Sequence, residues 1–315
     1  LQEQCGLEVV TDGEFRRISY WEKFVRLTGG LEVKEAVFRF HDAQGRESEF
    51  TAPYVKGKVA RRAPIALDEY EFLAGATTKV GKITLPAPST MHFYRFTDWG
   101  SAYPDAEAFF HDLGKVYQAE IADLARAGCR YVQLDEVAVA ILCDPAARER
   151  VKAKGADPDR LIDLYIDAIN QAVANAPAGV SLGVHVCRGN YKGMYLSEGG
   201  YDSVAERFFG RTRVHHFLLE FDTPRAGGFA PLRFVPRDKG VVLGLVSSKA
   251  PQLESIEFLK ERVAEAARHV DAGRLAISPQ CGFASTMGGN PLTEADQRAK
   301  LQLCVEAAQA VFKTG

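Results

Sequence analysis

Four side chains of types that commonly bind metals occur where strand-like runs of this sequence end. His185 and Cys187 end the run SLGVHVC, Glu220 ends HHFLLE, and Cys281 follows LAISPQ. Zinc prefers cysteine sulfur and histidine nitrogen, and it also accepts a carboxylate oxygen. His185 and Cys187 are two residues apart on an extended segment, so both side chains can point to the same side. A fold that brings these strand ends together would make a zinc site of the four residues.

This set of ligands favours one kind of zinc chemistry. Two thiolates and a carboxylate around Zn²⁺ give a net charge of about −1, which makes a poor Lewis acid for generating hydroxide. The same site leaves a bound thiolate electron-rich, so the pattern favours thiol alkylation over hydrolysis. Structural roles are the alternative. Cys281 could be a buried core residue, as free cysteine often is, and Glu220 could pair with Arg213 or Arg225.

Carboxylates stand at two further strand ends. Glu14 follows LEVVTDG, and Asp135 and Glu136 follow YVQL. A buried carboxylate is costly unless it is paired or bound to a metal. In a (β/α) barrel the catalytic groups lie at the carboxyl ends of the strands. We therefore expect these carboxylates and the four candidate ligands to form one site.

The elements that must position these residues alternate between strands and helices. Seven runs are short, nearly continuously apolar and rich in β-branched residues, as strands buried on both faces should be. They span residues 7–11, 82–86, 130–135, 180–186, 215–221, 240–246 and 274–279. Amphipathic patterns predict helices over 105–127, from Asp157 onward, over 253–270 and over 293–312. Such alternation predicts a parallel sheet.

We predict a single catalytic domain over residues 1–315 with the (β/α)₈ TIM-barrel fold. A closed barrel needs eight strands, and LQEQCG reads as the end of a helix closed by Gly6, so we expect the first strand upstream of Leu1. An open doubly wound sheet is the alternative, although no G-x-G-x-x-G motif supports a dinucleotide fold. Residues 30–65 read as an inserted hairpin with DAQG as its turn, and 187–213 as a long glycine-rich loop followed by a short helix.

Composition excludes several classes of function. The 315 residues carry a net charge of −2 with no basic stripe, so we expect no nucleic-acid partner. No apolar run approaches the roughly 18–20 residues that cross a bilayer. The six cysteines are scattered, which predicts reduced thiols and a cytoplasmic protein. We expect structural roles for four of them, namely Cys5, Cys129, Cys143 and Cys304.

Several motifs together resemble the C-terminal catalytic barrel of cobalamin-independent methionine synthase. They are H-x-C at 185–187, Glu220 sixty-one residues before Cys281, the context PQCGF, and, in order, VVTDGEFRR, LPAPSTM and VQLDE. The resemblance covers nearly the whole chain and is greatest to the short, single-barrel branch of the family. It implies that His185, Cys187, Glu220 and Cys281 bind Zn²⁺.

The resemblance also implies a substrate and a reaction. Glu14 and Asp135 would hold the amino group of homocysteine while zinc binds and deprotonates its sulfur, which then attacks a methyl group to give methionine. We also predict Ser89, Glu136 and Arg188 as substrate contacts. The donor would be methyltetrahydrofolate, a methylated corrinoid or a smaller methyl compound, and the protein could be a homodimer.

Two departures from the family concern the methyl donor and the proton donor. The full-length enzyme has a second, N-terminal barrel, for which 315 residues leave no room. The family's D-x-H-S-P-like segment supplies a histidine as proton donor, but this chain reads GLVSSKAP at 244–251. Ser247, Ser248 or Lys249 could take its place.

Three other functions remain open at this point. One is alkyl transfer to a different small thiol, such as a sulfonate, for which Arg16, Arg17 or Arg188 could supply the positive charge. Another is a barrel that binds a metal or ligand without catalysis. The third is a decarboxylase of the uroporphyrinogen type, which uses no metal and does not explain the four candidate ligands.

Overall fold

Seven parallel strands form the centre of the molecule in a computed structural model that describes residues 1–96, 98 and 100–312. The strands follow one another in chain order across the sheet, which confirms the predicted alternation. They are β1 (Val9–Val10), β6 (Val80–Pro86), β7 (Tyr131–Glu136), β8 (Ser181–Val186), β9 (His216–Glu220), β10 (Gly240–Val246) and β11 (Leu275–Pro279).

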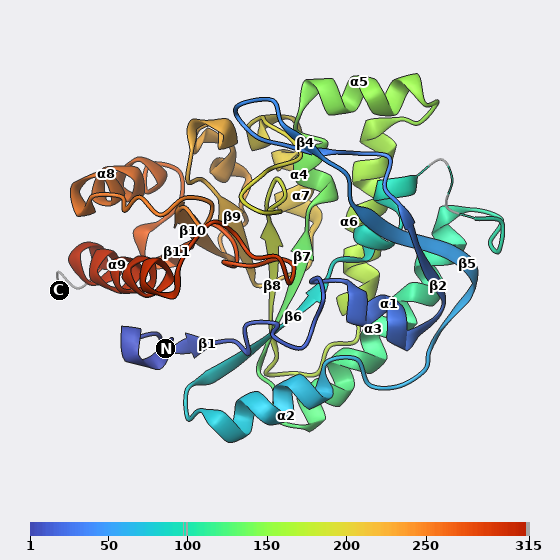
Figure 1. Ribbon diagram of the computed structural model, residues 1–315, viewed down its shortest axis with the longest axis horizontal. Coiled ribbons are helices and arrows are strands. Elements are labelled where there is room, and N and C mark those ends of the chain that lie inside the picture. Colours follow the sequence, from blue (N-terminus) through green and yellow to red (C-terminus); the bar gives the residue numbers. More distant parts are fainter. Residues whose placement is uncertain (97, 99, 313–315) are drawn as a thin grey trace.

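The sheet curls, and helices lie around it (Figure 1). The fold is therefore a curled half-barrel of the α/β class and not the open doubly wound sheet. Within the described residues β1 and β11 form the two edges and do not pair with each other. The loops that follow them do meet: Tyr20 N donates to Ser285 O at 3.1 Å, and Met287 N donates to Ile18 O at 2.9 Å.

The parallel register places the candidate residues along one rim. Asp135 on β7 lies opposite His185 on β8, and Glu220 on β9 lies opposite Gly244 on β10. Because all these strands run in the same direction, their carboxyl ends meet at the same side of the sheet.

Nine helices are assigned in the described part of the chain. They are α1 (Glu22–Leu27), α2 (Leu67–Ala76), α3 (Ala106–Arg126), α4 (Ala138–Ile141), α5 (Pro145–Ala153), α6 (Pro158–Val173), α7 (Ala205–Arg211), α8 (Ile256–Ala266) and α9 (Glu294–Phe312).

Local capping sets the helix boundaries. Asp105 accepts a hydrogen bond from Ala108 N at the start of α3, and Asp157 caps α6 ahead of Pro158, as the sequence predicts. Helix α8 is shorter than the predicted 253–270. The side chain of Ser255 accepts from Phe258 N, so the first turn is capped there and the helix begins at Ile256.

The predicted insertion is a hairpin within a hairpin. Strand β2 (Thr28–Glu35) pairs with β5 (Thr51–Arg61), and between them β3 (Phe40–His41) pairs with β4 (Glu47–Ser48). The DAQG turn is held by Asp42, whose Oδ1 accepts from Gln44 N and Arg46 N at 3.0 Å each. This inner hairpin contacts the long loop after β8 through two backbone hydrogen bonds of 2.9 Å between His41 and Tyr195.

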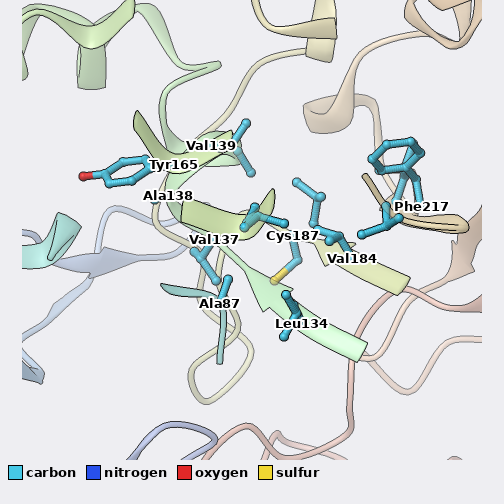
Figure 2. Close-up of a cluster of buried hydrophobic side chains, with 14 of the residues drawn as sticks. Ala87, Leu134, Val137, Ala138, Val139, Tyr165, Val184, Cys187 and Phe217 are labelled. Atoms are coloured by element: carbon cyan, nitrogen blue, oxygen red, sulfur yellow. The ribbon is translucent and has the colours of Figure 1, made fainter. Parts of the chain in front are cut away.

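The apolar interior extends up to the candidate site. Figure 2 shows Cys187 among Leu134, Val184 and Phe217, which come from three adjacent strands. All six cysteines are free. The four with predicted structural roles are all buried, as expected for core residues. Among the described residues, no helix combines the length and the apolar character needed to cross a bilayer.

Candidate metal centre and substrate site

Three of the four predicted ligands converge. One ligand atom each from His185, Cys187 and Cys281 lies within 4.8 Å of the other two. His185 is on β8, Cys187 directly follows β8, and Cys281 comes two residues after β11. The fold therefore brings together residues that are nearly one hundred positions apart in the chain.

The chemistry of this cluster fits a soft divalent cation. His185 Nε2 is buried and has no hydrogen-bond partner among the described residues, a costly state for a polar atom unless a ligand completes it. The neighbouring Cys187 thiol, with help from His185, lowers the pKa of Cys281 well below its usual value. Interaction with Cys281, together with burial, raises the pKa of Cys187. A zinc ion would replace the proton between two such sulfurs, since zinc binds thiolates.

Glu220 stands beside this cluster and is held by cations. Its Oε2 accepts from Arg188 N at 2.6 Å, and its Oε1 accepts from Arg225 at 3.0 Å. Although burial raises the pKa of Glu220, the charges of Lys249, Arg188 and Arg225 lower it to about 2. The low pKa favours the charged carboxylate at neutral pH. It lies outside the group of three ligand atoms, and the pairing with Arg225 that the sequence allowed is present.

A second group of carboxylates lies on the other side of His185. Glu14 follows β1 in the left-handed backbone region, with φ of 56°. Its Oε1 accepts from Arg17 at 3.1 Å and from Thr84 Oγ1 on β6. On the next strand, Asp135 accepts from Gln133 at 2.7 Å. Glu14 and Asp135 therefore lie on either side of β6, close enough for the charge of Asp135 to act on Glu14.

Burial and mutual repulsion affect the charge of these two acids. Burial raises the pKa of Glu14 to about 7; Arg17 opposes this effect, and Asp135 adds to it. Burial also raises the pKa of Asp135, against the positive influence of His185. A cation placed between them would relieve the repulsion, so the pair is suited to an ammonium group.

The other predicted substrate contacts are bonded inside the protein. Ser89 Oγ donates to Glu136 Oε2 at 2.6 Å, and Val139 N donates to Glu136 Oε1 at 2.9 Å. Burial raises the pKa of Glu136 to about 7. The guanidinium of Arg188 is fully buried and donates to Gly199 O at 2.9 Å. It anchors the long loop after β8 because the loop's buried carbonyls need donors.

A cavity of about 330 Å³ is lined in part by Arg225, the residue that bonds Glu220. Its walls come from the inner hairpin, the loop after β8 and the ends of β9 and β10. The lining includes Asp42, Arg46, Lys192, Asp222, Arg225 and Lys249. Lys249 Nζ is buried and has no hydrogen-bond partner among the described residues. The sequence predicted the insertion but gave no sign that its turn would form a wall of the site.

The chain matches a known protein family over nearly its whole length. The model described as the catalytic domain of cobalamin-independent synthase matches residues 1–310. The chain belongs to this family, as the sequence motifs predicted. Membership supports a methyltransferase activity.

Individual relatives span most of this chain. YxjH of Bacillus subtilis, an uncharacterized protein, is 40% identical over 99% of this chain and 83% of its own length. Methionine synthase of Pyrococcus horikoshii is 28% identical over 89% of this chain and 72% of its own.

Solved structures agree on the fold. A Listeria monocytogenes protein, assigned provisionally as a vitamin-B12 independent methionine synthase, has a TM-score of 0.73 at 29% identity, covering 99% of this chain and 83% of that one. A B12-independent methionine synthase from Shewanella, solved with selenomethionine, has a TM-score of 0.76 at 22% identity, covering 99% and 84%. These neighbours are TIM barrels, and the curled sheet belongs to that architecture.

Proposed function

We propose that this protein is a zinc-dependent methyltransferase that methylates the thiol of homocysteine to give methionine. The observation that carries the proposal is the register of β7 and β8. It sets Asp135, a candidate for binding an ammonium group, directly opposite His185 of the metal cluster. One small molecule with a thiol at one end and an amine at the other can reach both.

Each group in the site has a defined task in this proposal. His185, Cys187 and Cys281 would hold the zinc, with Glu220 as the predicted fourth ligand. Bound zinc would keep the acceptor thiol deprotonated at neutral pH, where a free thiol with a pKa near 8.5 is mostly protonated. Glu14 and Asp135 bind the amino group and so fix the direction from which sulfur meets the methyl group.

The methyl donor is proposed to occupy the cavity beside Glu220. The donors that we consider are methyltetrahydrofolate, a methylated corrinoid and a smaller methyl compound. Of the three residues that could replace the family's histidine, Ser248 is buried and donates to Gln280 at 2.9 Å. Lys249 lines the cavity, and its Nζ has no hydrogen-bond partner among the residues that the structure describes. Lys249 is therefore our candidate for protonating the departing part of the donor.

The zinc content of the purified protein tests the proposal most directly. We expect about one zinc per chain by elemental analysis and its loss in Cys187→Ala, because that variant removes one of the converging ligands. Cys129→Ala is the matched control, since Cys129 is a buried thiol away from the cluster, and it should keep the metal. Protein prepared without chelator that holds no zinc would refute the mechanism.

Alkyl transfer to a different thiol is the second candidate, because the cavity contains Lys192, Arg225 and Lys249. These cations could receive a sulfonate in place of an amino acid. Competition between homocysteine and 2-mercaptoethanesulfonate for the zinc-loaded protein separates the two. The acidic pair of Glu14 and Asp135 predicts a clear preference for homocysteine.

A further inference from the structure

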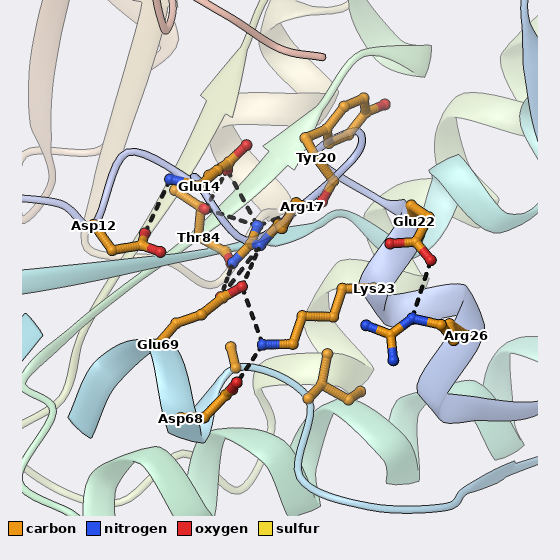
Figure 3. Close-up of polar contacts among 12 residues, drawn as sticks. Asp12, Glu14, Arg17, Tyr20, Glu22, Lys23, Arg26, Asp68, Glu69 and Thr84 are labelled. Atoms are coloured by element: carbon orange, nitrogen blue, oxygen red, sulfur yellow. Dashed lines mark hydrogen bonds and ion pairs between the residues drawn. The ribbon is translucent and has the colours of Figure 1, made fainter. Parts of the chain in front are cut away.

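An ion network runs from the surface of α2 to the substrate side of Glu14 (Figure 3). Arg17 donates from Nη1 to Glu14 Oε1 at 3.1 Å and from Nη2 to Glu69 Oε2 at 2.6 Å. Lys23 lies 3.1 Å from Glu69 Oε1 and 2.6 Å from Asp68. Arg17 is the member of this network that joins the site to the helix.

The guanidinium of Arg17 is fixed from several directions. Its Nε also donates to Glu69, and its Nη2 donates to Thr84 O at 2.8 Å. The side chain of Glu69 is fully buried and that of Arg17 is 3% exposed. A bidentate contact of this kind fixes orientation as well as charge. Glu14 therefore meets a donor that cannot rotate away from it.

The two buried carboxylates of this network, Glu69 and Glu14, contact different numbers of cations. Glu69 contacts two cations, Arg17 and Lys23, whereas Glu14 has an ion pair only with Arg17 among the described residues. Loss of Arg17 would leave Glu69 with Lys23 as a cationic partner, whereas Glu14 would have no ion pair among the described residues and would keep only its hydrogen bond from Thr84. The effect of removing Arg17 should consequently concentrate on Glu14.

We propose that Arg17 is a positioning residue that holds Glu14 for recognition of the acceptor's amino group. This rests on the proposed function, in which Glu14 binds homocysteine. Arg17 and Thr84 both bond Oε1, and Oε2 accepts no hydrogen bond from the described residues. The network thus occupies one oxygen and leaves the other for an ammonium group.

The charged groups around Glu14 determine how its pKa would change if Arg17 were removed. Asp12 lies in the same loop, Glu69 projects from α2, Lys82 from β6 and Asp135 from β7. Burial and the acidic neighbours favour the protonated form, while Arg17 favours the carboxylate. Without Arg17, Glu14 should hold its proton to a higher pH and lose its attraction for an ammonium group.

Calorimetric binding to the zinc-loaded protein, without any methyl donor, tests this role. The probes are homocysteine and 4-mercaptobutanoate, which lacks the amine. For Arg17→Gln we expect a roughly tenfold or greater loss in homocysteine affinity, the scale of a charged hydrogen bond. Affinity for 4-mercaptobutanoate and zinc content should change by less than about twofold. The homocysteine defect should shrink between pH 7 and pH 8.5 as Glu14 ionises.

Three further variants separate positioning from general stability. Arg16→Gln is the matched control, because Arg16 is exposed and stacks on Phe72 at 4.0 Å, and it should bind both probes normally. Arg17→Lys keeps a cation for Glu69 with fewer donors and should give an intermediate loss; it also replaces Arg17→Gln if that variant fails to fold. In a Glu14→Gln background, Arg17→Gln should add no further loss.

The outcomes are distinguishable. Equal weakening of both probes in Arg17→Gln, or full additivity with Glu14→Gln, would overturn the positioning role and leave the proposed function intact. Wild-type protein that binds the two probes equally would refute amine recognition by Glu14, and both proposals would then fail.

Discussion

The metal side and the acidic side of the site differ in how their polar groups are satisfied. On the metal side, His185 Nε2 is buried and accepts or donates no hydrogen bond within the described part of the chain, and two cysteine sulfurs lie close enough to affect each other's pKa. On the acidic side, Glu14 and Glu69 are bonded to Arg17, and Lys23 completes the compensation of charge. An added ion would complete the donor atoms of the first side, whereas most of the second is satisfied by its own residues.

This difference predicts how mutations on each side would affect function. A site with unsatisfied ligands gains most of its stability from the ion that it binds. A network with internal partners is formed before the substrate arrives and is already oriented. Mutations on the metal side should therefore abolish function outright, and those on the acidic side should reduce affinity by degrees.

The largest effect is expected from Cys281→Ala. Removing this thiolate should release zinc and lower methyl transfer by at least about a thousandfold, because the acceptor thiol would no longer be activated. The barrel should stay folded, since Cys281 is at a loop and is only partly buried. Metal analysis, activity and circular dichroism on one preparation check the three statements. Wild-type turnover in this variant would contradict the zinc mechanism.

Glu220→Gln should weaken the metal without abolishing it. The amide keeps the shape of the side chain but loses the charge that Arg225 and Lys249 stabilise. We expect zinc affinity to fall about 10- to 100-fold, as for loss of a ligand or of its close support. A competition titration against a zinc chelator measures this. An unchanged affinity would remove Glu220 from the ligand set.

On the acidic side, Asp135→Asn should affect the acceptor and not the metal. The loss of one carboxylate should weaken homocysteine binding by about tenfold, the value of a charged hydrogen bond. Zinc content should remain at the wild-type level because Asp135 is outside the ligand cluster. Calorimetry with homocysteine reports the first quantity and elemental analysis the second. A variant that binds homocysteine normally would make the acceptor assignment wrong.

The last prediction concerns the pH dependence of stability at Glu136 and involves neither metal nor acceptor. Burial raises its folded-state pKa from 4.5 to about 7. A raised pKa stabilises the fold below the unfolded pKa and loses that contribution as pH rises through the folded pKa. Wild type should therefore lose about 2–3 kcal/mol relative to Glu136→Gln between pH 4.5 and pH 7. Urea unfolding of both proteins at several pH values tests this, and parallel pH curves would count against it.

Much of the fold could be predicted because buried parallel strands leave a strong pattern. The seven apolar runs correspond to the seven strands, and three of the four candidate ligands at their ends converge. The eighth strand that we expect upstream of Leu1 remains a prediction. Helix α8 was predicted too long because the apolar pattern continues past the residues at which capping stops the helix.

The partners of the site residues were harder to predict. Glu69 lies in LDEYEF, where an acidic residue on a helix is expected to face solvent, yet it is fully buried against Arg17 from 52 positions away. Arg188 follows Cys187 directly and was predicted to meet substrate, but it binds backbone carbonyls. In both cases the side chain is buried because a distant charge or carbonyl compensates it, and one local stretch of sequence does not contain that information.

The contact between the loops after β1 and β11 has a consequence for measurement. Tyr20 N and Met287 N are hydrogen-bonded across this seam, and Cys281 lies in the same loop as Ser285 and Met287. A metal ion bound by Cys281 would also restrain that loop. Metal binding and formation of the hydrogen bonds between the two loops would then be linked equilibria. The exchange rates of these two amide hydrogens should slow as the cluster fills. They would report occupancy of the site without substrate, turnover or a spectroscopically visible metal.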